Sequence, residues 1–151
     1  MSDRVAVATG HIGLNVTDIE RSRRFYEGAI GLQLVGQSKD AERRYLFLGD
    51  GERLVLTLWQ QSEGAFEKAR PGLHHLSFEV PTIEDVERAE ARLRGLGVHF
   101  HHEGVVAHGE GTASGGIFFE DPDGIRLEIY SQTGAEAHAA ATPGAPSCGF
   151  F

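Results

Sequence analysis

The sequence has little of several things that other classes of protein need. Its 151 residues include a single cysteine, Cys148, which rules out an intrachain disulfide and a cysteine-rich zinc module. No apolar run approaches the roughly 20 residues that cross a bilayer, and the first residues lack the long apolar core of a secretion signal. We therefore expect a cytoplasmic protein without a membrane-spanning segment.

Positive charge is also scarce. Lys and Arg number 14 against 22 Asp and Glu, which gives a formal net charge of −8 and a pI of about 5.4. Proteins that bind nucleic acid or anionic membranes present a basic face to phosphate groups. The composition therefore argues against both of these partners.

What the sequence does contain is a repeat. Residues 11–16, His-Ile-Gly-Leu-Asn-Val, align with residues 75–80, His-Leu-Ser-Phe-Glu-Val, at a spacing of 64 positions. Each copy is followed by a stretch of helical periodicity and then by three segments of strand character. This order, β-α-β-β-β twice, predicts one α+β domain over residues 5–131, with modules at about 8–60 and 72–131. We expect the two modules to form a curved mixed sheet around a cleft.

Capping and turn residues set the expected boundaries of the elements. Thr17 and Glu20 have the spacing of a capping box at the start of the first helix, and Thr82 precedes the second. The second helix is expected to bury Ile83, Val86, Ala89, Leu93 and Leu96. The strands are expected at residues 32–38, 43–48 and 53–59, and again at 98–103, 116–120 and 125–130. Residues 132–151 are rich in Ala, Gly and Pro and are expected to form a flexible tail.

Strand alternation gathers polar residues on one face of each module. Successive side chains of a strand point to opposite faces. If the apolar residues of the opening strands pack on the helices, His11 and His75 lie on the face away from them. Glu128 lies on the corresponding face of the last strand, whereas His74 points to the helix side. Both histidines and the carboxylate are therefore expected to line the cleft.

The repeat and its two opening histidines are accompanied by the segment Asp-Pro-Asp-Gly at residues 121–124, which is followed by Glu128. Together these features resemble the vicinal oxygen chelate superfamily. This group includes glyoxalases, extradiol catechol dioxygenases, fosfomycin-resistance enzymes and bleomycin-binding proteins. The likeness covers about residues 10–131 and implies one scaffold that serves several chemistries. It implies a metal-binding cleft whose ligands are His11, His75 and Glu128.

The resemblance also bears on the identity of the metal. A fourth ligand, Glu or Gln in glyoxalases, falls here on Val55, and shifting the alignment by one residue gives Leu54 or Leu56. Two histidines and one carboxylate with open positions are the ligand set of non-haem Fe(II) oxygenases. We therefore expect a divalent metal, Fe(II) first, with Mn(II), Zn(II) or Ni(II) as alternatives.

The activity that the resemblance favours is extradiol, ring-cleaving dioxygenation of a small aromatic substrate with two vicinal oxygens, using O2. His108 lies close to where these enzymes place an acid/base histidine, but their tyrosine near the following strand is replaced by Phe118 or Phe119. The family also implies a homodimer. The residues expected to line the substrate pocket are Asn15, Phe47, Trp59 and Tyr130, although the aromatic ones could equally fill the core.

Other functions remain open at this point. Bleomycin-resistance relatives sequester an aromatic antibiotic and generally lack the metal triad. Fosfomycin-resistance relatives add a nucleophile to an epoxide, and glyoxalases use a further carboxylate that Val55 does not supply. The run His-Phe-His-His at residues 99–102 alternates between faces without a carboxylate at fixed spacing, so a second metal site is not expected there.

Overall fold

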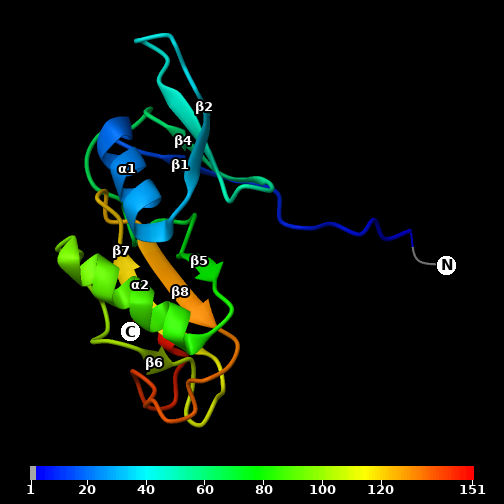
Figure 1. Cartoon of the computed structure of the whole chain (residues 1–151), viewed down its shortest axis with the longest axis vertical. Coiled ribbons are helices and arrows are strands. Elements are labelled where there is room, and N and C mark those ends of the chain that lie inside the picture. Colours follow the sequence, from blue (N-terminus) through cyan, green and yellow to red (C-terminus); the bar gives the residue numbers. More distant parts are fainter. Residues whose placement is uncertain (1–2) are drawn as a thin grey trace. The chain divides into compact units, whose positions relative to one another are not determined.

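The computed structural model of the protein describes residues 3–151, and the chain divides into two compact units, Met1–Glu63 and Gly64–Phe151. Each unit contains one of the two sequence repeats. Each is built on a four-stranded mixed sheet with one main helix (Figure 1). The α+β class and the duplicated β-α-β-β-β order are therefore confirmed.

The first unit places its opening strand beside its last. The sheet order is β1-β4-β3-β2, in which β1 and β4 run parallel and the other pairs run antiparallel. Parallel pairing of the first and last strands requires a crossover, and the helix supplies it. The elements are β1 (Ile12–Asn15), α1 (Ile19–Phe25), the π-helical turn η1 (Tyr26–Ile30), β2 (Gln33–Gln37), β3 (Tyr45–Gly49) and β4 (Leu54–Trp59).

Helix α1 is capped by Asp18 and not by Thr17, so the predicted capping box is wrong by one residue. Asp18 has an extended backbone, and its carboxylate accepts a hydrogen bond from the N–H of Arg21 at 3.1 Å. The Thr17 hydroxyl instead accepts from the Arg21 side chain. Glu20 is engaged with Arg44 at 2.8 Å, so it is not the partner of a cap. Aspartate and threonine cap helices similarly well, so the sequence alone does not separate them.

The second unit repeats this topology. Its sheet order is β5-β8-β7-β6, again with a parallel pair, β5 and β8, between the first and last strands. The elements are β5 (Leu76–Glu79), α2 (Ile83–Gly95), β6 (Val106–Ala107), β7 (Gly115–Glu120), β8 (Arg126–Ser131) and the short 3-10 turn η2 (Ser147–Gly149).

Helix α2 begins and packs as the sequence predicts. The Thr82 hydroxyl accepts from the N–H of Asp85 while the Asp85 carboxylate accepts from the N–H of Thr82, which makes a full capping box. Two residues of the predicted buried stripe are not buried: Ile83, in the first turn, is half-buried, and Leu96, just past the last helical residue, is 56% exposed. The buried residues of the helix are Val86, Ala89 and Leu93.

The strand predicted at residues 98–103 is mostly absent. Phe100 forms one isolated bridge with Phe119, and regular pairing resumes only at β6. Between them Gly104 adopts a left-handed φ of 68°, which turns the chain away from the strand direction. The histidine-rich run therefore forms a loop at the edge of the sheet.

The turn before β8 follows the Asp-Pro-Asp-Gly pattern closely. The Asp121 carboxylate accepts from the N–H groups of Asp123 and Ile125, both at 2.9 Å, as aspartate does in many turns. Gly124 supplies the left-handed residue with φ of 85°. This turn sets the start of β8 and hence the register that positions Glu128.

Residues 132–151, expected to be flexible from their composition, follow a defined path along the second unit. Ala140 pairs with Ala107 at the edge of β6, and the Ser147 hydroxyl donates to the carbonyl oxygen of Ala107 at 2.5 Å. Ser147 and Phe150 are buried. Small residues make this close approach possible, so the same composition that suggests disorder also suits a tight packing layer.

Within residues 3–151 no helix is long and apolar enough to cross a membrane.

Candidate metal and substrate site

Strands β5 and β8 bring His75 and Glu128 together in the second unit. Their parallel register sets Ser77 opposite Glu128, which leaves His75 directly before the paired residues and on the same face. The His75 Nε2 lies 3.5 Å from Glu128 Oε2. Glu128 is 3% exposed, so its carboxylate is a buried acid facing an imidazole.

Burial favours the neutral form of His75. Desolvation lowers the pKa of His75 below its ordinary value, and this effect outweighs the Glu128 charge, which acts in the opposite direction. The exposed neighbour His74 approaches His75 with Nδ1 atoms 2.8 Å apart. A neutral imidazole is the form that binds metal ions.

His108 completes a three-residue cluster around the buried carboxylate. Its Nε2 hydrogen-bonds to Oε1 of Glu128, and its Nδ1 lies 2.8 Å from the Ser114 hydroxyl. If Nε2 carries the proton that the carboxylate accepts, Nδ1 of the neutral ring accepts from the Ser114 O–H. The Ser114 hydroxyl thus orients the ring, a contact that the sequence pattern did not reveal.

Tyr130 lies beside His108 on the same face of the sheet. The two ring centroids are 5.2 Å apart, and the Tyr130 hydroxyl donates weakly to Glu79 at 3.4 Å. Burial first, and the Glu79 charge second, raise the pKa of Tyr130 above its usual value. Tyr130 therefore contributes a protonated, aromatic wall to this face.

The first unit presents an aromatic face at the matching positions of its own sheet. Trp59 pairs with Asn15 on β1 and with Tyr45 on β3. Its ring centroid is 5.2 Å from that of Tyr45 and 6.2 Å from that of Phe47. The Asn15 side-chain oxygen accepts from the N–H of Gln61 at 2.9 Å, so this amide anchors the chain after β4.

His11 is exposed and lies directly before β1, as His75 lies directly before β5. Two residues after each histidine lies a residue that pairs with the last strand of its unit: Gly13 pairs with Thr57, and Ser77 pairs with Glu128. The equivalence of the two histidines, inferred from the repeat, thus agrees with the strand registers within each unit.

The same registers correct the position equivalent to Glu128 in the first unit. It is Thr57 and not Val55, because Thr57 pairs with Gly13 as Glu128 pairs with Ser77. The Thr57 hydroxyl accepts from Trp59 Nε1 at 2.9 Å and is buried. The conclusion that this position lacks a carboxylate is unchanged, but the residue that occupies it is different.

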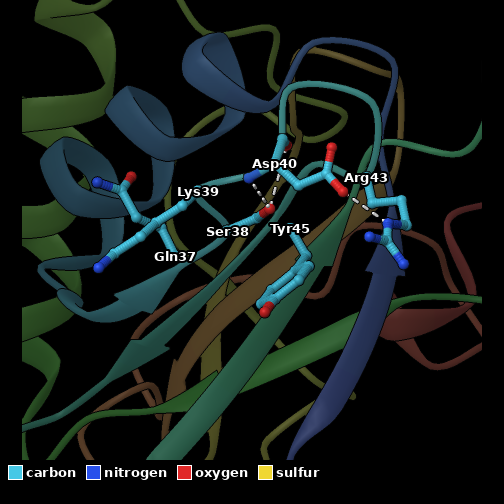
Figure 2. A pocket seen from close by; sticks show the side chains of 6 residues that line it. All are labelled: Gln37, Ser38, Lys39, Asp40, Arg43 and Tyr45. Atoms are coloured by element: carbon cyan, nitrogen blue, oxygen red, sulfur yellow. Dashed lines mark hydrogen bonds and ion pairs between the residues drawn. The ribbon is translucent and has the colours of Figure 1, made fainter.

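A polar hollow at the β2–β3 loop of the first unit was not anticipated (Figure 2). The Ser38 hydroxyl accepts from the N–H of Asp40, and the Asp40 carboxylate accepts from Arg43 Nε at 2.7 Å. These contacts are local and hold the loop together. The lining residues are Gln37, Ser38, Lys39, Asp40, Arg43 and Tyr45.

His75 and Glu128 of the second unit are spaced as two ligands of one metal ion would be. Two protein ligands bound to one metal at about 2.1 Å lie roughly 3 to 3.5 Å apart, and the His75 and Glu128 atoms are separated by 3.5 Å. Throughout residues 3–151, no group of three or more His, Cys, Asp or Glu side chains is arranged to hold a metal ion. The second unit therefore offers two donors, His75 and Glu128.

Each unit thus gathers part of the predicted site. The second brings together His75, His108, Glu128 and Tyr130, and the first brings together Asn15 and Trp59, with Phe47 beside them. The protein is therefore a small duplicated α+β protein. Each βαβββ unit has a histidine before its opening strand, and the second unit pairs its histidine with a carboxylate.

Comparison with known proteins defines the family. Residues 8–129 match the family described as Glyoxalase/Bleomycin resistance protein/Dioxygenase superfamily, and the chain belongs to that superfamily. The resemblance inferred from the sequence is therefore confirmed at the level of the superfamily.

Individual relatives show how varied the chemistry on this fold is. The chain is 29% identical over 124 residues to a catechol-2,3-dioxygenase of Bacillus subtilis, a match that covers 81% of this chain but 40% of the relative. A glyoxylase/bleomycin resistance protein/dioxygenase domain from Frankia has a TM-score of 0.71 at 25% identity, covering 84% of this chain and 98% of that one. The fosfomycin resistance protein FosX from Listeria monocytogenes, complexed with Mn(II) and sulfate, has a TM-score of 0.64 at 20% identity. This match covers 87% of this chain and 98% of that one.

Proposed function

We propose that the protein is a divalent-metal-dependent enzyme, Fe(II) being the favoured metal, that cleaves the ring of a catechol-like substrate beside its two hydroxyl groups. The observation that carries the proposal is the buried Glu128 carboxylate held between His75 and His108. A structural role alone would not require one buried acid to face two imidazoles. The similarity to a catechol-2,3-dioxygenase supports the same reading.

The proposed ligands are His11, His75 and Glu128, the set expected for non-haem iron. When bound, the metal would supply Lewis acidity, which lowers the pKa of a substrate hydroxyl and holds two vicinal oxygens in place. In the overall reaction both atoms of O2 enter the ring-opened product. The catechol-like substrate and O2 are therefore the proposed small-molecule partners, and a homodimer is the proposed assembly.

His108 is the proposed acid/base of the reaction. Its ring is oriented from one side by Ser114 and from the other by Glu128, so its freedom to rotate is small. When the substrate hydroxyl replaces one of these two partners, the ring nitrogen that is released can take the hydroxyl proton and return it to the product. Phe118 or Phe119 stands where the resemblance implies a tyrosine, and neither side chain can supply a proton, which leaves this task to His108.

Aromatic residues of both units are the proposed walls for the substrate ring. Trp59 and Tyr130 occupy equivalent positions of the two sheets, opposite Asn15 and Glu79. Phe47 lies beside Trp59. Flat aromatic side chains favour a planar, apolar ring and gain from stacking on it.

Replacing His108 with glutamine should remove turnover while leaving metal binding in place. General acid/base groups contribute roughly 100- to 10,000-fold to rate, so we expect a loss in kcat of at least about 100-fold. The measurement is steady-state kinetics with iron content determined on the same sample. Ser114→Ala, which leaves the imidazole but removes its hydroxyl partner, should lower kcat by a smaller factor.

The proposed activity is tested by adding Fe(II) and a panel of catechols under anaerobic conditions and then admitting air. We expect a coloured ring-opened product from at least one catechol, with consumption of one O2 per molecule of product. If iron binds in stoichiometric amount and none of the catechols is turned over, the proposed activity is wrong.

Sequestration of an aromatic ligand is a second candidate, which the aromatic face of the first unit favours. Tyr45, Phe47 and Trp59 form a half-exposed cluster that could bind a planar ligand without chemistry. Under this candidate, ligand affinity would be unaffected by His75→Ala. Under the proposed enzyme, loss of the ligand His75 would weaken substrate binding.

A further inference from the structure

The C-terminal tail is anchored to the segment that carries His108. The N–H of Ser147 donates to the carbonyl oxygen of His108 at 2.9 Å, and the Ser147 carbonyl oxygen lies 3.0 Å from His102 Nε2. Ser147 is 1% exposed. The tail therefore follows the functional face of the second unit by specific hydrogen bonds and lies outside the matched residues 8–129.

From this anchor the chain places Phe150 on the histidines. The Phe150 ring centroid lies 5.6 Å from that of His75 and 5.0 Å from that of His101. Phe118, which pairs with Glu128 across the sheet, contacts the same ring at 5.4 Å, edge to face. Phe150 thus packs directly against a proposed metal ligand and beside the strand position of another.

Phe150 also has a charged neighbour and an unusual backbone conformation. The Arg126 guanidinium carbon lies 5.1 Å from the Phe150 ring centroid, a cation–π contact. Phe150 is 5% exposed. Among residues 3–151 it is the one non-glycine residue with a positive φ, 57°, a conformation that costs about 1 kcal/mol or more for such a side chain. Contacts of the ring must offset that cost.

We propose that Phe150 is a positioning residue of the proposed metal site: it holds the His75 imidazole toward Glu128 and shields it from water. In this proposal the C-terminal tail is part of the metal site, because it carries Phe150. An apolar ring against a metal ligand controls the access of solvent to it, and residues behind a ligand that fix its orientation by hydrogen bonds change metal affinity 10- to 100-fold. This inference rests on the proposed role of His75, but part of its test does not.

The neighbouring residue provides a matched control. Phe151 is the same residue type one position on, and it is 75% exposed. Phe151→Ala removes as many atoms from the tail without uncovering His75. Phe150→Leu keeps an apolar cover and should restore most of what Phe150→Ala loses.

The first measurement uses metal-free protein and the modification of histidine by diethyl pyrocarbonate, followed by peptide mass spectrometry. His99, which is exposed, serves as the internal reference. We expect His75 to be modified several-fold faster in Phe150→Ala and at the wild-type rate in Phe151→Ala. An unchanged His75 rate in Phe150→Ala, with a lowered melting temperature, would show that Phe150 only packs the tail and would overturn the inference.

The second measurement is the rate at which Co(II) leaves the loaded protein for a chelator. We expect dissociation to be about tenfold faster in Phe150→Ala, with altered Co(II) absorption bands, and near wild type in Phe150→Leu and Phe151→Ala. Equal rates and spectra in Phe150→Ala and wild type would contradict the inference. If wild-type protein binds no Co(II), the proposed function fails, while the modification of His75 in metal-free protein still decides the role of Phe150.

Discussion

His75→Ala should weaken divalent-metal binding by at least about 100-fold, because it removes one of the proposed ligands outright. Substitution of a residue that only orients a ligand already lowers metal affinity 10- to 100-fold. Loss of the ligand itself should therefore lower the affinity further. The substitution also leaves the buried Glu128 without the imidazole that lies 3.5 Å from it. The measurement is a calorimetric titration of metal-free protein with Mn(II) or, anaerobically, Fe(II).

His99→Ala is the control for the His75 experiment. His99 is an exposed histidine in the loop after α2, so its loss should leave the metal dissociation constant unchanged. A dissociation constant for His75→Ala equal to that of His99→Ala would show that His75 does not bind the metal. The melting temperature of each variant separates a lost ligand from a lost fold.

Gly116→Ala is expected to destabilise the second unit by about 3 kcal/mol, at the upper end for overpacking. A Cβ on Gly116 would lie 2.1 Å from the carbonyl oxygen of Ile129 and 2.7 Å from the Cα of Tyr130. Because both atoms belong to the backbone of β8, neither can move aside as a flexible side chain could. Strands β7 and β8 would have to separate at the row that carries Tyr130.

The expected result is a fall in melting temperature of roughly 10 °C for a chain of this size. Gly95→Ala is the matched control, because a Cβ there meets no atom within 4 Å and the residue ends helix α2. Alanine favours helix over glycine by up to about 1 kcal/mol, so Gly95→Ala should be neutral or slightly stabilising. Equal melting temperatures for the two variants would contradict the β7–β8 register.

Local sequence rules predicted the parts of the site that depend on periodicity. Strand alternation chose His75 over His74, and the structure places His75 and not His74 beside Glu128. The Asp-Pro-Asp-Gly pattern predicted the turn that Asp121 holds together. These features depend on residues within one strand or turn, so a single sequence is enough to predict them.

Features that depend on how strands align were harder to predict. The glycines that open the two last strands, Gly51 and Gly124, both have left-handed φ values, so aligning them was reasonable. The first unit, however, places two more residues between that glycine and the paired position, and it has a register shift between Leu48 and Gly49. This difference in hairpin length moved the predicted equivalent of Glu128 to Val55 instead of Thr57.

Contacts that depend on how a loop or the tail folds back onto the sheet could not be predicted from the sequence. The hydrogen bonds from His108 to Ser114 and Glu128 depend on how the loop after β6 folds back on β8. The position of Phe150 depends on a tail whose composition suggested flexibility. In both cases the deciding interaction joins residues that no periodic pattern relates.

We propose that His11 binds the same metal ion as His75 and Glu128. The most direct test is to measure metal stoichiometry and affinity in the wild type and in His11→Ala side by side. We expect one divalent metal per chain in the wild type and binding weakened by at least about 100-fold in His11→Ala, as for His75→Ala. Wild-type stoichiometry and affinity in His11→Ala would show that His11 is not a ligand of the metal.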